Sequence, residues 1–197
     1  MSKEISKSSK AVQLHLGCGK KCIPRFLHID QNSHSHIDYK RDVRDLSIFT
    51  NDYVDLIYAS HILEYFFRDE VDDVLVEWRR VLKPGGLLRL AVPDFEAIVK
   101  VYQKYNDLDH QGILGPLYGK WPYGDDPDKQ NFTYHRTVYD FNSLKKVLLR
   151  TGFHNIQRYN WKKSIHSDFD DYSQAYIPHM DKENGILISL NVEAWKK

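Results

Sequence analysis

Two closely spaced glycines and one carboxylate are the residues whose spacing best suits a binding role in this sequence. Gly17 and Gly19 follow the apolar run that ends at Leu16, and Asp30 ends the next apolar run. Glycines at such a turn let the backbone bend sharply and pass close to a ligand. A carboxylate at the tip of the following strand can accept hydrogen bonds from a pair of ribose hydroxyls. Together they predict a nucleoside-binding edge.

The residues after the turn favour a nucleoside that carries no diphosphate. A dinucleotide site needs a third glycine, where this chain has Cys22, and a helix whose N-terminus holds the pyrophosphate. The stretch from Lys20 to Arg25 is too short for that helix and contains Pro24. S-adenosylmethionine has no phosphate and suits this turn. A nicotinamide-dependent oxidoreductase stays as the alternative.

Alternating apolar runs and helical periodicities predict the elements that position this edge. The expected strands are residues 11–16, 26–29, 53–59, 87–92, 153–161 and 186–194, with a short strand or turn at 41–46. The expected helices cover residues 71–82, 94–105 and 144–148. Only a polar loop separates the last two strands, so they should pair antiparallel. The pattern predicts an α/β fold in three layers, Rossmann-like, with a mostly parallel central sheet and an antiparallel C-terminal strand.

Length and charge favour one domain that acts on small partners. The 197 residues fit a single domain, with 42% apolar and 28% charged residues and a net charge of +1. Basic pairs are scattered along the chain, which disfavours a nucleic-acid partner. An RNA substrate stays as an alternative, since folding can bring separate basic pairs together. The polar segment 1–10 should be flexible and lacks the apolar core of a signal peptide, and no apolar run could span a membrane. We therefore expect a cytoplasmic protein.

Residues 106–135 interrupt the strand and helix pattern. Glycines and prolines alternate there with aromatic residues, among them Trp121 and Phe132. Such a stretch predicts an ordered insertion, and ligands of open α/β sheets lie beyond the carboxyl ends of the strands, where the insertion should also lie. We expect it to form a lid that binds the acceptor. A lid that only covers the sheet edge is the alternative.

Metal binding and disulfide formation are not expected. Cys18 and Cys22 lie beside the glycine turn, where a disulfide would strain the backbone, so both should be free thiols. The loop pair His34 and His36, with Asp38, lacks a further ligand cluster at suitable spacing. No metal site is predicted.

Several segments resemble the successive motifs of class I S-adenosylmethionine-dependent methyltransferases, specifically the methyltransferase type 11 group. They are residues 14–19, Asp30, Asp42 with Val43, residues 54–64 and residues 78–86. The resemblance implies S-adenosyl-L-methionine as cofactor. It also implies that the cofactor is bound by Leu16, Gly17, Cys18, Gly19, Asp30, Asp42, Val43, Ser60 and His61. Asp30 would hold the ribose hydroxyls, Asp42 the adenine amino group, and Val43 would pack on the ring.

The sequence gives less direct signals for the methyl acceptor and for the catalytic base. Methyl transfer to a hydroxyl or a protonated amine needs a base, and His61 and His135 are the catalytic candidates, with Glu64 and Asp94 as weaker ones. Packing or helix capping is the alternative for each of the four. The short first crossover resembles a subgroup tied to carbohydrate metabolism, so a small-molecule or carbohydrate acceptor is expected. A cofactor-binding module without turnover stays as a further alternative.

Overall fold

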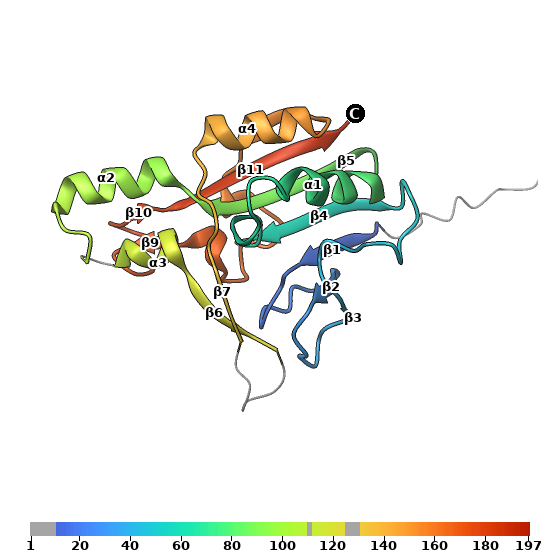
Figure 1. Ribbon diagram of the computed structural model, residues 1–197, viewed down its shortest axis with the longest axis horizontal. Coiled ribbons are helices and arrows are strands. Elements are labelled where there is room, and N and C mark those ends of the chain that lie inside the picture. Colours follow the sequence, from blue (N-terminus) through green and yellow to red (C-terminus); the bar gives the residue numbers. More distant parts are fainter. Residues whose placement is uncertain (1–10, 110–111, 125–130) are drawn as a thin grey trace, which may run out of the picture.

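A computed structural model of the chain describes residues 11–109, 112–124 and 131–197. The expected flexible segment 1–10 lies outside these ranges. Seven strands form the main sheet, in the order β3-β2-β1-β4-β5-β11-β8 (Figure 1). Their bounds are β1 Gln13–Leu16, β2 Leu27–Asp30, β3 Tyr39–Lys40, β4 Val54–Ser60, β5 Leu82–Pro93, β8 Phe153–Arg158 and β11 Ser189–Lys196. The strands from β3 to β5 pair in parallel, and β11 is antiparallel to both β5 and β8. The predicted α/β fold and its antiparallel C-terminal strand are confirmed.

Three longer helices form where the apolar periodicity and capping residues predict them. They are α1 Val71–Val81, α2 Phe95–Tyr105 and α4 Phe141–Arg150. The Asp94 carboxylate caps α2 by accepting from the Glu96 amide at 3.1 Å, and Asp140 with Ser143 forms a capping box at the start of α4. No helix among the described residues is both long and apolar enough to cross a membrane.

The main apolar core lies between one face of the sheet and helices α1 and α4. Figure 1 shows these two helices over the same face, and Arg150 of α4 is bonded to Asp72 of α1 at 2.6 Å. Trp78 is fully buried there, and its indole N–H donates to the Val43 carbonyl at 2.8 Å. Aliphatic side chains of β1, β4, β5 and β11 complete this core.

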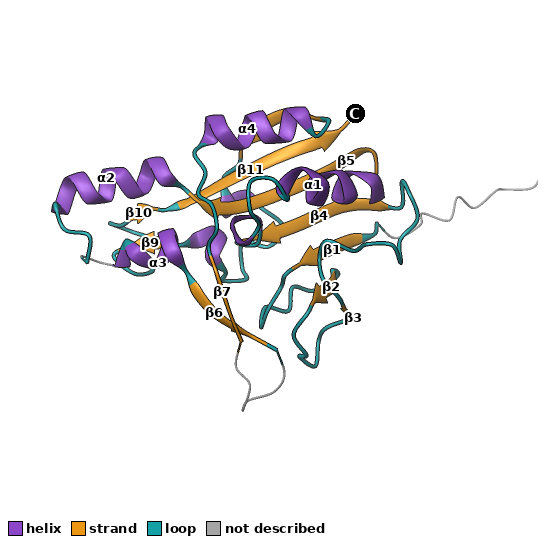
Figure 2. Ribbon diagram, viewed as in Figure 1, coloured by secondary structure: helices purple, strands orange, loops and turns teal. Residues whose placement is uncertain are grey.

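Much of the opposite face of the sheet is polar, although most of it is buried. Its polar side chains alternate with the core positions, and they are His15, His28, Tyr58, Arg89, Ser189, Asn191 and the half-buried Glu193. A small apolar cluster that includes Leu56 and Phe26 lies on the same side. Loop segments cover this face, including the short 3-10 turns η3 Trp161–Lys163 and η4 Tyr172–Gln174 (Figure 2). Tyr58, for example, stacks on His166 at 4.0 Å and donates a hydrogen bond to Asp171. The third layer of the fold is therefore built from loops that bring polar groups to the sheet.

The connection from β1 to β2 and residues 41–46 both agree with the sequence prediction. No helix joins β1 to β2, as expected from the short segment containing Pro24. Residues 41–46 form turns, and the edge strand of the sheet is instead β3. Asp42 accepts from the Arg44 amide at 2.9 Å, an aspartate turn that replaces strand pairing.

The aromatic insertion forms the short helix α3 Leu114–Tyr118 and a hairpin of β6 Lys120–Tyr123 with β7 Asn131–Tyr134. Figure 1 shows this hairpin projecting from the side of the molecule where β1 and β4 end. A second small sheet, β9 Tyr176–Ile177 with β10 Ile186–Leu187, leads into β11. The apolar side of α2 contacts this sheet and Ile113. Hairpin and small sheet therefore both lie near the carboxyl ends of the parallel strands.

Candidate active site

The glycine turn lies at the carboxyl end of β1 and needs its two glycines for different reasons. Gly17 and Gly19 have φ angles of 62° and 52°, in the left-handed region that glycine tolerates best. A Cβ atom on Gly17 would lie 2.0 Å from Cγ1 of Ile62, whereas one on Gly19 would meet no described atom within 4 Å beyond its chain neighbours. The first glycine therefore makes room for Ile62. The second leaves open space in which a ligand can approach the backbone.

Asp30 is held against this turn by two backbone hydrogen bonds. Its carboxylate accepts from the Gly19 amide at 2.8 Å and from the Asn32 amide at 2.8 Å, and the residue is 6% exposed. A carboxylate has about four acceptor positions, so two bonds leave capacity for a pair of hydroxyls. The predicted ribose acceptor is thus pre-oriented at the end of β2.

Leu16 and Cys18 flank Gly17 but turn their side chains inward. Leu16 is fully buried in the main core, and Cys18 is 4% exposed. Burial, with the nearby charge of Asp30, raises the pKa of the Cys18 thiol to about 12, so it stays protonated. Cys18 and Cys22 are both free. Leu16 and Cys18 can therefore contribute to a ligand site only through their backbones.

Asp42 and Val43 lie in the turns beyond β3, beside the end of β2. Backbone bonding joins the two places, since the Arg41 amide donates to the Asp30 carbonyl at 2.9 Å. The Asp42 carboxylate is engaged by the Arg44 side chain at 2.6 Å, and Val43 is only 6% exposed. The structure places both residues at the expected edge, with Asp42 already paired to a cation and Val43 largely inside the core.

Ser60 is the last residue of β4 and His61 follows it, next to the glycine turn. The Ser60 hydroxyl oxygen is buried without a hydrogen-bond partner among the described residues, so a bound ligand could satisfy it. His61 has a φ of 53°, and its amide donates to the Ala91 carbonyl at 2.8 Å. A left-handed histidine costs backbone energy, which is a recurring feature of functional positions.

The two predicted catalytic histidines meet at one buried carboxylate. Glu64 is fully buried, and its Oε1 lies 3.1 Å from Nδ1 of His61 and 3.8 Å from Nε2 of His135. His135 bonds the Pro116 carbonyl through Nδ1 at 2.8 Å, and its ring packs on Gly119. Its side chain is 5% exposed. These contacts fix the His135 side chain at the base of the hairpin. His61 is the histidine closer to the surface.

Aromatic side chains border His61 on the side of the hairpin. The Tyr172 ring lies 5.5 Å from His61, and the Trp121 ring lies 5.7 Å from Tyr172. Tyr172 and Trp121 are 43% and 45% exposed, which is ample for contact with a ligand. The hairpin also reaches the cofactor edge, because the Gly124 amide donates to the Asn32 side chain at 2.9 Å. It therefore spans from Glu64 to the residues next to Asp30.

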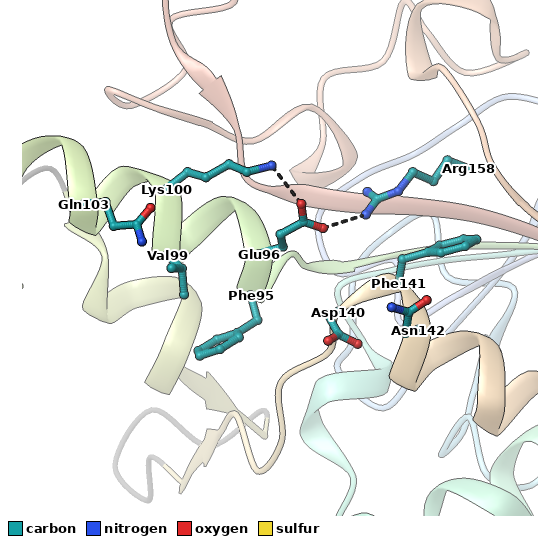
Figure 3. Close-up of a pocket in the computed structure, with 9 residues that line it drawn as sticks. All are labelled: Phe95, Glu96, Val99, Lys100, Gln103, Asp140, Phe141, Asn142 and Arg158. Atoms are coloured by element: carbon teal, nitrogen blue, oxygen red, sulfur yellow. Dashed lines mark hydrogen bonds and ion pairs between the residues drawn. The ribbon is translucent and has the colours of Figure 1, made fainter.

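A surface groove of about 530 Å³ lies elsewhere, between α2 and the start of α4 (Figure 3). Its charges neutralise one another: Glu96 bonds Lys100 at 2.8 Å and lies 3.5 Å from Arg158. None of the predicted cofactor residues lines it. Within the described ranges, no three His, Cys, Asp or Glu side chains gather as a metal ion would require. The glycine turn and the His61 cluster therefore remain the chemically distinctive region.

Sequence reasoning missed three contributors to this region. Tyr172 lies on η4, Ser189 opens β11, and Ser189 contacts Nε2 of His61 at 3.1 Å. The segment between β8 and β11 has no apolar periodicity, so it reads as a plain polar loop. Its one available signal was a dense run of polar and aromatic residues, Asp170 to Gln174. Ile62 was missed as well, because its contact with Gly17 depends on the tertiary fold.

Comparison with known proteins agrees with this geometry. A family model described as a methyltransferase domain matches residues 14–90. No curated protein matches the sequence.

Solved structures share the fold at low sequence identity. A SAM-dependent methyltransferase from Archaeoglobus fulgidus is 15% identical, with 94% of this chain and 86% of that chain covered and a TM-score of 0.55. One from Methanosarcina mazei is 18% identical, with 95% and 93% covered and a TM-score of 0.54. The 1,6-didemethyltoxoflavin-N1-methyltransferase of Burkholderia thailandensis, solved with its substrate and S-adenosylhomocysteine, is 13% identical, with 95% and 71% covered and a TM-score of 0.53.

The matched segment, residues 14–90, contains the glycine turn, Asp30, Ser60 and His61. The open space at Gly19 and the unpartnered Ser60 hydroxyl fit an adenosyl cofactor better than a dinucleotide, which would need a pyrophosphate-binding helix after β1. Residues 14–90 thus match a methyltransferase-domain model, and the chain shares the fold of solved S-adenosylmethionine-dependent methyltransferases.

Proposed function

We propose that this chain is an S-adenosylmethionine-dependent methyltransferase and that it modifies a hydroxyl or amine of a small molecule or glycan precursor. The observation that carries the proposal is the position of His61, which lies between the buried Glu64 carboxylate and the exposed pair Tyr172 and Trp121. A histidine beside an aromatic surface at the carboxyl ends of the strands can both orient an acceptor and take its proton.

The cofactor is proposed to lie along the edge from the glycine turn to β3. S-adenosylmethionine supplies an electrophilic methyl group on a positively charged sulfur. The backbone at Gly17 and Gly19 would support its methionine part, and Asp30 would accept from the ribose hydroxyls. Asp42 and Val43 would border the adenine, and Asp42 would have to share its carboxylate with Arg44.

Acceptor recognition is proposed to involve the inner face of the hairpin. Trp121 pairs across the hairpin with Thr133, and Pro122 pairs with Phe132, so Trp121 and Phe132 project to opposite faces. Trp121 faces Tyr172, and two aromatic rings with open faces suit a sugar or a planar ring. The similar Burkholderia structure is named as a 1,6-didemethyltoxoflavin-N1-methyltransferase and holds bound 1,6-didemethyltoxoflavin, which supports a small-molecule acceptor.

A panel of candidate acceptors tests this proposal. Formation of S-adenosylhomocysteine would be followed with monosaccharides, amino sugars, small alcohols and heterocyclic amines, and with RNA and protein as contrasting classes. We expect turnover with a member of the first group. For that acceptor, Trp121→Ala should raise KM about tenfold, the effect of losing about 1.4 kcal/mol of ring contact.

Phe132→Ala is the matched control, because Phe132 is 39% exposed on the other face of the same hairpin. It should leave KM unchanged. Turnover only with RNA or protein would contradict the proposed acceptor class, and equal effects of the two variants would remove Trp121 from acceptor binding.

A further inference from the structure

His61 lies between a buried carboxylate on one side and a pair of hydrogen-bonding side chains on the other. Nδ1 lies 3.1 Å from Oε1 of Glu64, and Nε2 lies 3.1 Å from the hydroxyl oxygen of Ser189. Ser189 in turn lies 3.2 Å from Oδ1 of Asn191. Three elements that are distant in sequence, the end of β4, η1 Leu63–Tyr65 and the start of β11, supply these groups.

Glu64 determines which nitrogen of His61 carries hydrogen. The 3.1 Å contact is an ion-pair distance, and neither carboxylate oxygen of Glu64 has a hydrogen-bond partner among the described residues. An ionised carboxylate has no hydrogen to give and would repel a lone pair on Nδ1, so the contact favours a hydrogen on Nδ1. Glu64 is fully buried, and the only cationic or potentially cationic side chains that form an ion pair with its carboxylate in the described structure are His61 and His135. Losing the His61 contact would leave a buried carboxylate poorly paired, which is costly. The His61 ring is therefore held with the lone pair on Nε2.

His135 lies on the other side of Glu64. The Pro116 carbonyl can only accept, so Nδ1 of His135 carries a hydrogen. Its Nε2 lies 3.8 Å from the same Oε1 atom of Glu64. The ring is fixed between Gly119 and Tyr65, whose ring lies 4.8 Å away. Glu64 is thus placed by the hairpin base as well as by its own 3-10 turn.

Ser189 has a choice of two acceptors. Its hydroxyl can donate to Nε2 of His61 or to Oδ1 of Asn191, at nearly equal distances. Asn191 is oriented for this role, because its amide group donates to the Ser173 carbonyl at 2.8 Å and so turns Oδ1 toward Ser189. When Ser189 donates to Asn191, the Nε2 lone pair is free for another donor.

We propose that Glu64 is a positioning residue that fixes His61 with hydrogen on Nδ1, and that Ser189 covers Nε2 until an acceptor displaces its hydrogen bond. This inference deepens the proposed function and rests on it. The acceptor hydroxyl or amine then donates its hydrogen bond to Nε2. Methylation would form a bond from the acceptor oxygen or nitrogen to the methyl carbon and break the bond of that carbon to sulfur, with S-adenosylhomocysteine as the leaving group. The proton that the acceptor loses moves to Nε2, and the resulting imidazolium is paired with Glu64. Return of the proton to solvent restores the neutral ring, so protons balance over the cycle.

Nitrogen-15 NMR of the histidine rings tests the proposal without an acceptor. The full-length protein, labelled with 15N-histidine and saturated with S-adenosylhomocysteine, should show His61 with hydrogen on Nδ1 and an unprotonated Nε2 above neutral pH. Glu64→Gln removes the charge that selects this form, so the population with hydrogen on Nε2 should rise. Ser189→Ala keeps the Glu64 contact and should leave the tautomer unchanged.

Hydrogen on Nε2 of His61 in the wild-type protein would overturn the proposal. So would a tautomer that responds to Ser189→Ala and not to Glu64→Gln. The wild-type spectrum decides even where a variant fails to fold, and S-adenosylhomocysteine affinity reports whether each variant keeps its cofactor site. The acceptor panel is a separate measurement. If a small-molecule acceptor is found but His61 carries hydrogen on Nε2, only the proposed role of Glu64 and Ser189 is refuted. If the expected tautomer is found but turnover occurs only on macromolecules, only the proposed acceptor class is refuted.

Discussion

Replacement of Gly17 by alanine tests the packing that builds the cofactor turn. The added Cβ would sit in a left-handed backbone position with φ of 62° and would lie 2.0 Å from Cγ1 of Ile62. The backbone position costs about 1–2 kcal/mol, and forcing extra volume against Ile62 costs about 1–3 kcal/mol. We therefore expect Gly17→Ala to lower the free energy of unfolding by about 2–5 kcal/mol.

Gly19→Ala is the matched control, since it has a similar φ of 52° and no described atom within 4 Å of the added carbon beyond its chain neighbours. It should cost only the backbone contribution, about 1–2 kcal/mol. Its effect should instead fall on cofactor affinity, with S-adenosylhomocysteine binding weakened about tenfold, because the new methyl group enters the open space beside the turn.

Ile62→Ala separates the two contributions to the cost at Gly17. It removes Cγ1 and Cδ1, and the remaining Cβ lies at 3.4 Å from the added carbon, an ordinary contact. In that background Gly17→Ala should cost only about 1–2 kcal/mol, so a double-mutant cycle should show a coupling of about 1–3 kcal/mol.

Urea unfolding of the wild type, the three single variants and the Gly17→Ala/Ile62→Ala double variant measures these quantities. Each kcal/mol should also appear as a change in Tm of about 2–4 °C for a chain of this size. Equal destabilisation by Gly17→Ala and Gly19→Ala, or no coupling between positions 17 and 62, would refute the reasoning.

Two further predictions concern the polar face of the sheet. Burial lowers the pKa of His166 from 6.5 to about 4. The folded state therefore binds fewer protons than the unfolded state between these pH values. The contribution of His166 to the free energy of unfolding is fully present above pH 6.5, and it falls by about 3 kcal/mol as the pH drops to about 4. His166→Phe should keep the stacking on Tyr58 and leave no group without its hydrogen-bond partner, since neither ring nitrogen of His166 has one among the described residues. Urea unfolding from pH 7 to 4 should show a smaller loss of stability in the variant than in the wild type, and equal losses would contradict this. Glu193 pairs with Arg89 at 2.7 Å, and both side chains are largely buried. Glu193→Gln should therefore destabilise the protein by about 3–5 kcal/mol, whereas Glu183→Gln, at an exposed position, should leave stability unchanged. A loss below about 1 kcal/mol in Glu193→Gln would contradict this, because that is the range of exposed surface ion pairs.

The sequence predicts most of the main sheet because its signals are local. Apolar runs and helical spacing indicate β4 and α1, and Asp94 before an apolar periodicity marks the start of α2. Gly17 and Gly19 mark a tight turn, since only residues without a Cβ enter the left-handed region freely. Asp30 follows from its place at the end of a strand.

The remaining features depend on contacts between distant residues. Glu64 and His135 are brought together by the hairpin base, and Ser189 meets His61 because β11 enters the sheet beside β5. The loops over the polar face have no periodic pattern, so their positions follow from partners such as Tyr58 and Asp171. Residues 41–46 form turns because aspartate side chains bond nearby amides there, which competes with strand pairing.

Titration of S-adenosylhomocysteine into wild-type protein and Asp30→Ala tests the central claim most directly. Asp30 is predicted to accept from the ribose hydroxyls, and the loss of a buried acceptor costs about 1–3 kcal/mol, or about 5- to 150-fold in Kd. Asp45→Ala, a carboxylate exposed near the same edge, serves as the control and should bind as the wild type does. Tight binding to wild type, weakened by Asp30→Ala alone and with no comparable binding of NAD, is the predicted result. An unchanged affinity in Asp30→Ala, or tighter binding of NAD than of S-adenosylhomocysteine, would contradict the account.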